Sequence, residues 1–303
     1  MMEILMLVGA MFLAGSSVVV GKVLATAVPV SIATFGSLLV AFICMLPLMW
    51  KRFGEVRNLT GRQWLYLFLQ GLCGIVLFRV FLLIGLQSTG AVQAGIITGT
   101  TPAVLAILSF WLLGERLSWR ALLSISCSVG GAILILTAAA SGASTAATAA
   151  GGLCVMAAVV CEALFTIFRK QVAHTVPAIT NTAVLIFCSL LLVMIPALVQ
   201  AGDLARILTV RTALAIIYYG MFATVLAYLL WTGAVGKVHG AIAGAATAMM
   251  PASSVLLGAI VLKEKLLPSH LAGLVLIVIG IIGAALATRS APAVIPAADR
   301  KNK

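Results

Sequence analysis

Ten apolar runs, each close to the length of a membrane-crossing helix, follow one another along the chain. A helix needs about 20 apolar residues to cross the hydrocarbon core of a bilayer. Because lipid offers no hydrogen-bonding partner to an open backbone, runs of this length must form helices. We therefore predict an all-α polytopic membrane protein. The ten predicted transmembrane helices are Ile4–Lys22, Val30–Trp50, Trp64–Gly85, Val92–Leu113, Trp119–Ala138, Gly152–Phe168, Ala178–Val199, Thr212–Val235, Ala241–Leu262 and Pro268–Ala287.

The composition excludes an ordinary soluble domain. Hydrophobic residues make up 63% of the 303 residues and charged residues only 9%, whereas soluble domains carry roughly 25% charged residues. In a soluble chain the formal net charge of +12 would suggest a nucleic-acid partner. Here most Lys and Arg residues lie between the apolar runs. We interpret them as determinants of membrane topology and of contact with acidic headgroups, and we expect no nucleic-acid partner.

One stretch of the chain occurs twice. Residues 98–117 read TGTTPAVLAILSFWLLGERL, and residues 247–266 read TAMMPASSVLLGAIVLKEKL. In both copies an apolar run of helix length begins with a proline and ends in Glu, a basic residue and Leu. The two prolines, Pro102 and Pro251, lie 149 residues apart, which is about half the chain. The sequence therefore predicts an internal repeat.

Two halves of five helices each account for this repeat. The small-residue segment at 141–151 lies between the fifth and sixth predicted helices, and we predict a flexible linker there. The first repeat is then expected at 1–140 and the second at 152–288, followed by a basic tail at 289–303.

The distribution of Lys and Arg predicts the orientation in the membrane. With both termini in the cytoplasm, 13 of the 19 Lys and Arg residues fall on the inner side, five fall on the outer side, and Arg79 lies within a span. This excess follows the positive-inside rule. Because each half has an odd number of helices, the second half would enter the membrane upside down, as in the inverted repeats of many secondary transporters. We expect a multi-pass protein of the cell (inner) membrane.

Several motifs around the repeated stretches are similar to those of a known family. They are GSSVVVGK at 15–22, GERL at 114–117, EALFTIFRK at 162–170 and KEKL at 263–266. With Pro102 and Pro251, these motifs resemble the ten-helix EamA-type members of the drug/metabolite transporter superfamily over nearly the whole chain. The resemblance implies a carrier with a central cavity between its halves. It often implies the export of metabolites, amino acids or drug-like solutes.

The chain departs from this family pattern at two places. The family often has a Trp before the glycine of the first-span motif, but this chain has Ala14 there, and the corresponding residue of the second half is Glu162. The family often has an Arg within span two, but this chain has Gly36 there. An Arg appears instead in span three, at Arg79.

Glu162 and Arg79 are the two charged residues that lie deep inside predicted helices. A charge at that depth costs at least a few kcal/mol and usually faces the bundle interior or water. For Glu162 we predict a site for a substrate cation or a proton, since desolvation favours the neutral carboxyl group. For Arg79 we predict a clamp for an anion or carboxylate, which suits the rigid fork of guanidinium donors. The alternative for both is an ion pair with each other, which could open when substrate binds.

Further residues in the spans are predicted to contribute to the cavity. Pro102 and Pro251 each remove a backbone hydrogen bond, and discontinuous helices often build carrier sites, although proline is also tolerated in a first helical turn. The other candidates for substrate binding or coupling are Ser16, Ser17, Thr98, Thr101, Asn181, Tyr219 and Met250. For the tyrosine, the alternative is a place in the aromatic belt at the membrane surface.

Two sets of residues are predicted to have structural roles. Small residues at every fourth position allow close helix packing, with a gating role as the alternative. The glycines concerned are Gly95, Gly99, Gly240 and Gly244. At the ends of spans, we predict that Glu115 and Glu264 pair with neighbouring basic residues and that Lys22 and Lys170 anchor the helices at the membrane surface.

These features predict a secondary transporter, and more specifically an exporter, of small amino-acid-like or drug-like organic solutes. We expect alternating access, with protons as a candidate coupling ion. No G-x-x-x-x-G-K-[ST] phosphate loop occurs in the sequence, which argues against direct ATP drive. We expect no catalytic group, metal site or cofactor; the expected partners are the lipid bilayer and a small solute, and the oligomeric state is open. The alternatives are an intramembrane lipid-modifying enzyme and an uncoupled facilitator or scaffold.

Overall fold

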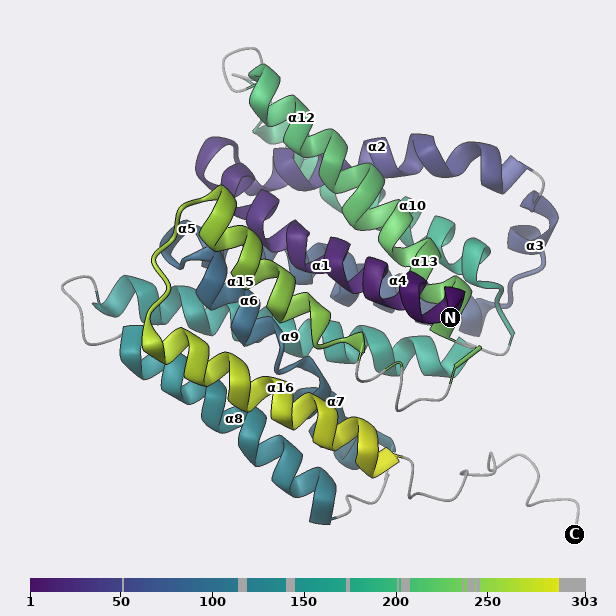
Figure 1. The fold of residues 1–303 in the computed structure, drawn as a ribbon. Helices are drawn as coiled ribbons and strands as arrows, with labels where there is room; N and C mark the ends of the chain where they lie inside the picture. Colours follow the sequence, from purple (N-terminus) through teal and green to yellow (C-terminus); the bar gives the residue numbers. More distant parts are fainter. Residues whose placement is uncertain are drawn as a thin grey trace, which may run out of the picture.

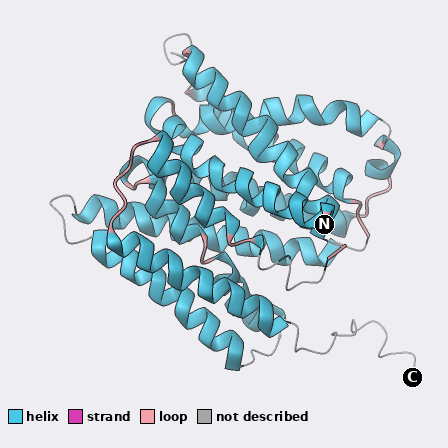
Figure 2. Cartoon of the chain, in the orientation of Figure 1, coloured by secondary structure: helices cyan, strands magenta, loops and turns pink. Residues whose placement is uncertain are grey.

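The structure is a computed structural model that describes residues 1–50, 52–113, 119–139, 145–172, 175–200, 202, 208–235, 237–238, 243 and 246–288. Within these ranges every element of regular secondary structure is helical, as Figure 2 shows. The predicted all-α class is therefore confirmed.

The helices pack into one bundle (Figure 1). Those of the N-terminal half are α1 (Met2–Ala27), α2 (Val30–Trp50), α3 (Phe53–Arg57), α4 (Gly61–Gly71), η1 (Leu72–Leu77), α5 (Phe78–Ser88), α6 (Ala91–Thr98), α7 (Thr101–Leu113) and α8 (Trp119–Ala139). Those of the C-terminal half are α9 (Thr145–Val172), α10 (Ala178–Val199), α12 (Val210–Tyr218), η3 (Tyr219–Leu226), α13 (Ala227–Val235), α15 (Met249–Val261) and α16 (Pro268–Thr288). The symbol η marks a helical stretch of π type.

Most of these helices are apolar enough to lie in a membrane. The segments of the described chain that are also long enough to cross it are Met2–Ala27, Val30–Trp50, Gly61–Ser88, Ala91–Leu112, Ala149–Val172, Ala178–Val199 and Val210–Val235. The shorter apolar helices are Leu122–Leu134, Met249–Val261 and Pro268–Gly283. These segments coincide with the predicted apolar runs, and the chain is an all-helical, multi-pass membrane protein.

The third and eighth predicted spans are built alike and are not continuous α-helices. Each begins at a capping box, in which a threonine and the residue three positions on bond each other's backbone amides. The pairs are Thr60 with Gln63 and Thr209 with Thr212, so the two boxes stand at the 149-residue offset of the sequence repeat. Each span is then interrupted by a π-type stretch, η1 in the first half and η3 in the second.

Corresponding helices of the two halves pack against each other. α2 lies along α10, and α8 lies along α16, the pair at the lower left of Figure 1. α1 packs on α15 of the other half, while α9, the counterpart of α1, packs on α6 and α7. Gly131 allows α8 and α16 to approach closely, since a Cβ added there would lie 2.8 Å from the carbonyl oxygen of Gly273. The two halves therefore share one interface, and each half contributes the equivalent helices to it.

Part of the predicted linker is helical. Residues 145–151 form the first turns of α9, although flexibility was expected there. Alanine has the highest helix propensity of all residues, and 145–150 contains only Ala and Thr. Residues 141–144 and the tail at 289–303 lie outside the described ranges.

Glu264 closes one end of the bundle by capping α6. Its carboxylate oxygens accept hydrogen bonds from the backbone amides of Ala91 (2.8 Å) and Val92 (2.9 Å). A helix N-terminus favours negative charge because its first amides have no intrahelical partner. Lys263 makes this contact possible by adopting a left-handed backbone conformation (φ 55°), which turns the chain after α15. The predicted ion pair of Glu264 with its basic neighbour does not occur among the ion pairs of the described residues, and the carboxylate caps α6 instead.

Lys22 stabilises the turn between α5 and α6 from the side of α5. Its Nζ donates to the carbonyl oxygens of Leu86 (2.5 Å) and Thr89 (2.9 Å) at the C-terminal end of α5. A cation is favourable there because the last carbonyls of a helix carry partial negative charge. The turn between α5 and α6 is thus fixed by one cation from α1 and one carboxylate from the segment after α15.

Removing the Glu264 carboxylate should destabilise the protein. We expect Glu264→Ala to reduce the free energy of unfolding by about 1–2 kcal/mol, the usual cost of losing a helix cap. The matched control is Lys265→Ala, because this exposed neighbour makes no such contact with α6. Thermal unfolding in detergent measures both variants, and an equal Tm for the two would contradict the capping role.

Candidate solute-binding cavity

A cavity of about 360 Å³ lies between the two halves. Small-molecule sites usually have volumes of about 300–1,000 Å³. Its walls come from α1, η1, α5, α6 and α7 of the first half and from α9, η3, α13, α15 and α16 of the second. Both halves therefore contribute to one site.

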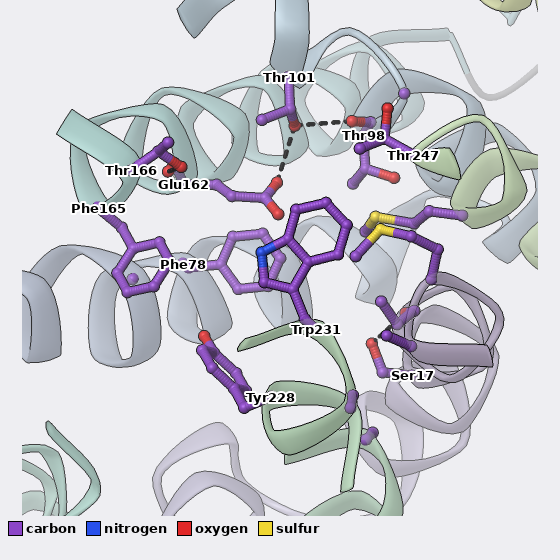
Figure 3. A pocket seen from close by; sticks show the side chains of 18 of the residues that line it. Ser17, Phe78, Thr98, Thr101, Glu162, Phe165, Thr166, Tyr228, Trp231 and Thr247 are labelled. Atoms are coloured by element: carbon purple, nitrogen blue, oxygen red, sulfur yellow. Dashed lines mark hydrogen bonds between the residues drawn. The ribbon is translucent and has the colours of Figure 1, made fainter. Parts of the chain in front are cut away.

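Glu162 projects into this cavity from α9 (Figure 3). Its Oε2 lies at hydrogen-bond distance, 2.8 Å, from the Thr101 hydroxyl oxygen. No basic side chain of the described residues lies within ion-pair distance of Glu162. A carboxyl group with a neutral partner in a solute-sized cavity can take up a proton or the ammonium group of a solute.

A break between two helices lies beside Glu162. In a continuous helix the amide of residue 102 would donate to the carbonyl oxygen of Thr98, but Pro102 has no amide hydrogen. The Thr101 hydroxyl lies 2.7 Å from that oxygen and takes the place of the missing donor. α6 ends at Thr98 and α7 begins at Thr101, so the single helix predicted at 92–113 is in fact two helices.

Arg79 lies on the cavity wall but is held by other parts of the protein. Its Nη1 donates to the hydroxyl of Ser37 at 2.7 Å, and its Nη2 donates to the hydroxyl of Thr224 at 2.5 Å. The guanidinium also lies over the ring of Tyr219, 4.6 Å from the centroid. With 5% of its surface exposed, the side chain is accommodated by two hydroxyl groups and an aromatic face.

The predicted ion pair between Arg79 and Glu162 does not occur among the ion pairs of the described residues. Both residues line the cavity, but each is bonded to hydroxyl groups instead. The physical reason is the π-type stretch η1, which ends just before Arg79 in the sequence. A π-type turn takes more residues than an α-turn and so rotates the side chains that follow it. Arg79 accordingly meets α2 and η3.

Aromatic side chains form much of the wall near Glu162. Figure 3 shows Phe78, Phe165, Tyr228 and Trp231 around the cavity. Phe165 packs against Tyr228 with ring centroids 6.1 Å apart and ring planes at 80°. Aromatic faces attract cations, so these rings and the carboxylate suit the same kind of ligand group.

Most of the predicted binding residues line the cavity, and three do not. Those on its wall are Ser17, Arg79, Thr98, Thr101, Pro102, Glu162, Tyr219 and Met250. Ser16 instead shares a hydrogen bond of 2.8 Å with the hydroxyl of Tyr218. Asn181 accepts a hydrogen bond of 2.7 Å from Arg169, and Pro251 is buried within α15.

The sequence pattern does not single out several of the wall residues. Phe165 could have been found from Glu162, because residues three apart share one face of a helix. Phe78 directly precedes Arg79, but its direction depends on η1. Ser37, the partner of Arg79 on α2, has no distinguishing pattern around it.

The structure places two of the four predicted packing glycines at close contacts. A Cβ added at Gly95 would lie 1.7 Å from the Oγ of Ser254 on α15. A Cβ added at Gly99 would lie 2.8 Å from a side-chain carbon on α16. Gly240 and Gly244 lie outside the described residues.

Comparison with known proteins decides the family. Residues 1–137 and residues 149–286 each match the EamA-like transporter family. The chain belongs to the EamA-like transporter family. This family unit occurs twice in the chain, once in each half, and the protein is a membrane transporter.

Two relatives and one solved structure match this chain over most of its length. The uncharacterized transporter YetK of Bacillus subtilis (strain 168) is 35% identical over 300 residues, covering 97% of this chain and 90% of YetK. The uncharacterized transporter YwfM of the same organism is 26% identical over 280 residues, covering 92% of this chain and 88% of YwfM. A solved structure described as "Crystal structure of protein" matches with a TM-score of 0.68 and 18% identity, covering 95% of this chain and 97% of that one. At that identity the likeness shows the fold alone.

Adding a methyl group at Gly95 should force α6 and α15 apart. We expect Gly95→Ala to cost about 1–3 kcal/mol of unfolding free energy, the usual range for overpacking. Gly130→Ala on α8 is the matched control, because a Cβ there meets nothing within 4 Å. Ser254→Gly should partly restore the Tm of the Gly95→Ala variant, since the serine side chain is the obstacle. An unchanged Tm in the single variant would contradict this contact.

Proposed function

We propose that this EamA-family protein is a secondary carrier that moves a small organic solute bearing an amine across the membrane by alternating access. The observation that carries the proposal is the Glu162 carboxyl group, which faces an aromatic-walled cavity and is bonded there to a neutral hydroxyl. A carboxylate forms strong charge-assisted hydrogen bonds with an ammonium group. Aromatic faces add attraction for the same cation.

The remaining cavity wall suits an apolar body on the solute. Besides the aromatic rings, it contains Met11, Leu105 and Met250. Methionine side chains adapt to irregular shapes, so such a wall tolerates variation in the body of the solute. Specificity would then come mainly from the charged group.

A solute that also carries a carboxylate has a second charged group to meet. Arg79 lines the same cavity and has five N–H donors, of which two bond Ser37 and Thr224. This observation favours amino-acid-like solutes within the amine class. A lipid-modifying enzyme has less support, because Glu162 is the one carboxylate among the described residues that line the cavity.

Alternating access rests on two halves of opposite orientation. We propose ten membrane crossings in two inverted repeats, at 1–140 and 152–288 with 141–151 between them, and both termini in the cytoplasm of the cell. The double family match, the pairing of like helices and the distribution of Lys and Arg support this arrangement. Such halves can rock about a shared site at their interface.

The contact of Glu264 with α6 joins the two halves at one end of this interface, and Lys22 fixes the adjacent end of α5 within the first half. On α1, the residues that line the cavity lie between Ala10 and Ser17, nearer the N-terminus than Lys22. We interpret the conformation as one that is closed at the Lys22 end. Opening there requires α6 to separate from Glu264.

Outward transport in exchange for protons completes the proposal. One carboxyl group cannot hold a proton and bind an ammonium ion at the same time, so occupancy of Glu162 by one excludes the other. The resemblance to EamA-type exporters supports the outward direction. Uptake into inside-out vesicles under an imposed pH gradient tests the direction.

Glu162→Gln should abolish recognition of the amine. In nanodiscs, we expect an arylalkylamine and the amino acid with the same ring to raise the Tm of the wild type, and the matching arylalkanoic acid to leave it unchanged. In the variant, the affinity for both amines should fall at least about tenfold, which corresponds to about 1.4 kcal/mol. Proton-driven uphill transport in proteoliposomes should be lost as well.

Glu3→Gln is the matched control for this experiment. Glu3 lies at the start of α1, 3.6 Å from the N-terminal amino group and away from the cavity lining. We expect this variant to bind and transport like the wild type. Full uphill transport by Glu162→Gln with an unchanged pH dependence would overturn the proposed role.

A further inference from the structure

Three groups from α6, α7 and α9 lie in a row at the cavity wall. They are the Thr98 carbonyl oxygen, the Thr101 hydroxyl and the Glu162 carboxyl group (Figure 3). The hydroxyl oxygen lies 2.7 Å from the carbonyl oxygen and 2.8 Å from Oε2 of the carboxyl group. Pro102 is the reason that the carbonyl needs a side-chain donor, since it removes the amide hydrogen that would otherwise reach Thr98.

A count of hydrogens shows what both short contacts require. The Thr101 hydroxyl has one hydrogen to donate, and the Thr98 carbonyl can only accept. If the hydroxyl donates to the carbonyl, then its contact with Glu162 is a hydrogen bond only when the carboxyl group donates. Both contacts are therefore satisfied together when Glu162 carries a proton on Oε2.

From this geometry we infer that Glu162, Thr101 and the Thr98 carbonyl form a proton-dependent hydrogen-bond chain that closes the break between α6 and α7. When Glu162 is protonated, its O–H donates to Thr101, which donates to Thr98. When the proton leaves to water in the cavity, the carboxylate draws the Thr101 hydrogen to itself. The Thr98 carbonyl then loses its donor.

The ionised state offers more to an amine than a carboxylate alone. Thr98 and Glu162 both line the cavity, so the released carbonyl and the carboxylate face the same space. An ammonium group has several N–H donors and can bond both at once. Proton release thus creates the amine site and loosens the helix break in one step. This inference rests on the proposed exchange of proton and amine at Glu162, and it names Thr101 as the positioning residue.

Few ionisable groups surround this chain of hydrogen bonds. α6 and α7 contribute none. The described ionisable residues that line the cavity with Glu162 are Arg79 on α5, Tyr219 in η3 and Tyr228 on α13. Cys161 directly precedes Glu162 on α9, and Cys73 lies buried in η1. Arg79 is the charged one among them at neutral pH, and it donates to Ser37 and Thr224. The pH response of the break is therefore assigned to Glu162.

Infrared difference spectroscopy of the protein in nanodiscs, recorded between low and high pH, tests the chain directly. The carboxyl C=O band that is lost in Glu162→Gln belongs to Glu162. We expect this band to shift to higher frequency in Thr101→Val and Thr101→Ala, because the carboxyl O–H loses its acceptor. Thr101→Ser should keep the wild-type band. Thr100→Val is the matched control, since Thr100 makes the same kind of bond, to the Ile97 carbonyl at 2.7 Å, without contacting a carboxyl group.

Hydrogen exchange of the peptide at 98–104 reports on the break itself. After correction for intrinsic rates, the wild type should exchange more slowly at low pH than at high pH, and Glu162→Gln should be slow at both. Pro102→Ala should lose the pH dependence and keep the Glu162 band, because its new amide satisfies the Thr98 carbonyl without Thr101.

An unshifted Glu162 band in both Thr101→Val and Thr101→Ala would overturn the inference, and so would a wild-type pH response of the break in Glu162→Gln. These outcomes are separate from transport. A normal infrared and exchange response in a protein that binds no amine would refute the proposed function and leave the hydrogen-bond chain in place.

Discussion

Lipid provides no hydrogen-bonding partner, so backbone groups within the spans must find one inside the protein, and a charge in a span is costly unless it is paired. The functional geometry of this transporter follows from that constraint. Pro102 removes a backbone donor, and the Thr101 hydroxyl replaces it. Arg79 brings a cation into the bundle, and two hydroxyl groups and an aromatic ring accommodate it. The same constraint makes the one hydrogen of Thr101 important, because two acceptors compete for it.

Helix breaks occur where side chains can satisfy the backbone. The turn between α5 and α6 is closed by Lys22 on the carbonyl side and by Glu264 on the amide side. The break between α6 and α7 is closed by Thr101. The turn precedes the span that contains Pro102 and the break lies within that span, and both depend on an ionisable side chain from outside it. The end of the bundle at Glu264 and the centre of the cavity are therefore connected through α6, a helix of eight residues.

The apolar runs predict the all-helical membrane fold, because bilayer thickness and helix geometry leave few other solutions. The family was predicted from the resemblance of motifs such as GERL and KEKL, not from the apolar runs. Glu162 could also be placed in the cavity, since a lone carboxylate in a span must face the interior. The pairing of Arg79 could not be predicted, because η1 rotates the residues after it and a 3.6-residue period no longer gives their direction. The contact of Glu264 with α6 could not be predicted for a similar reason, because the left-handed turn at Lys263 has no glycine to signal it. In each case a local departure from regular helix geometry decided the contact.

Distances between spin labels at the two ends of the bundle would test the central claim of alternating access at a shared cavity. In a cysteine-free background, one pair at Thr26 and Leu266 reports on the end that Glu264 closes, and a second pair at Met2 and Gln171 reports on the opposite end. All four residues are exposed. Electron–electron resonance at low and high pH, with and without an amine, should show one distance growing while the other shrinks. Glu162→Gln should abolish the pH-dependent part of this change. Distances that stay fixed, or that change in the same direction at both ends, would contradict the account.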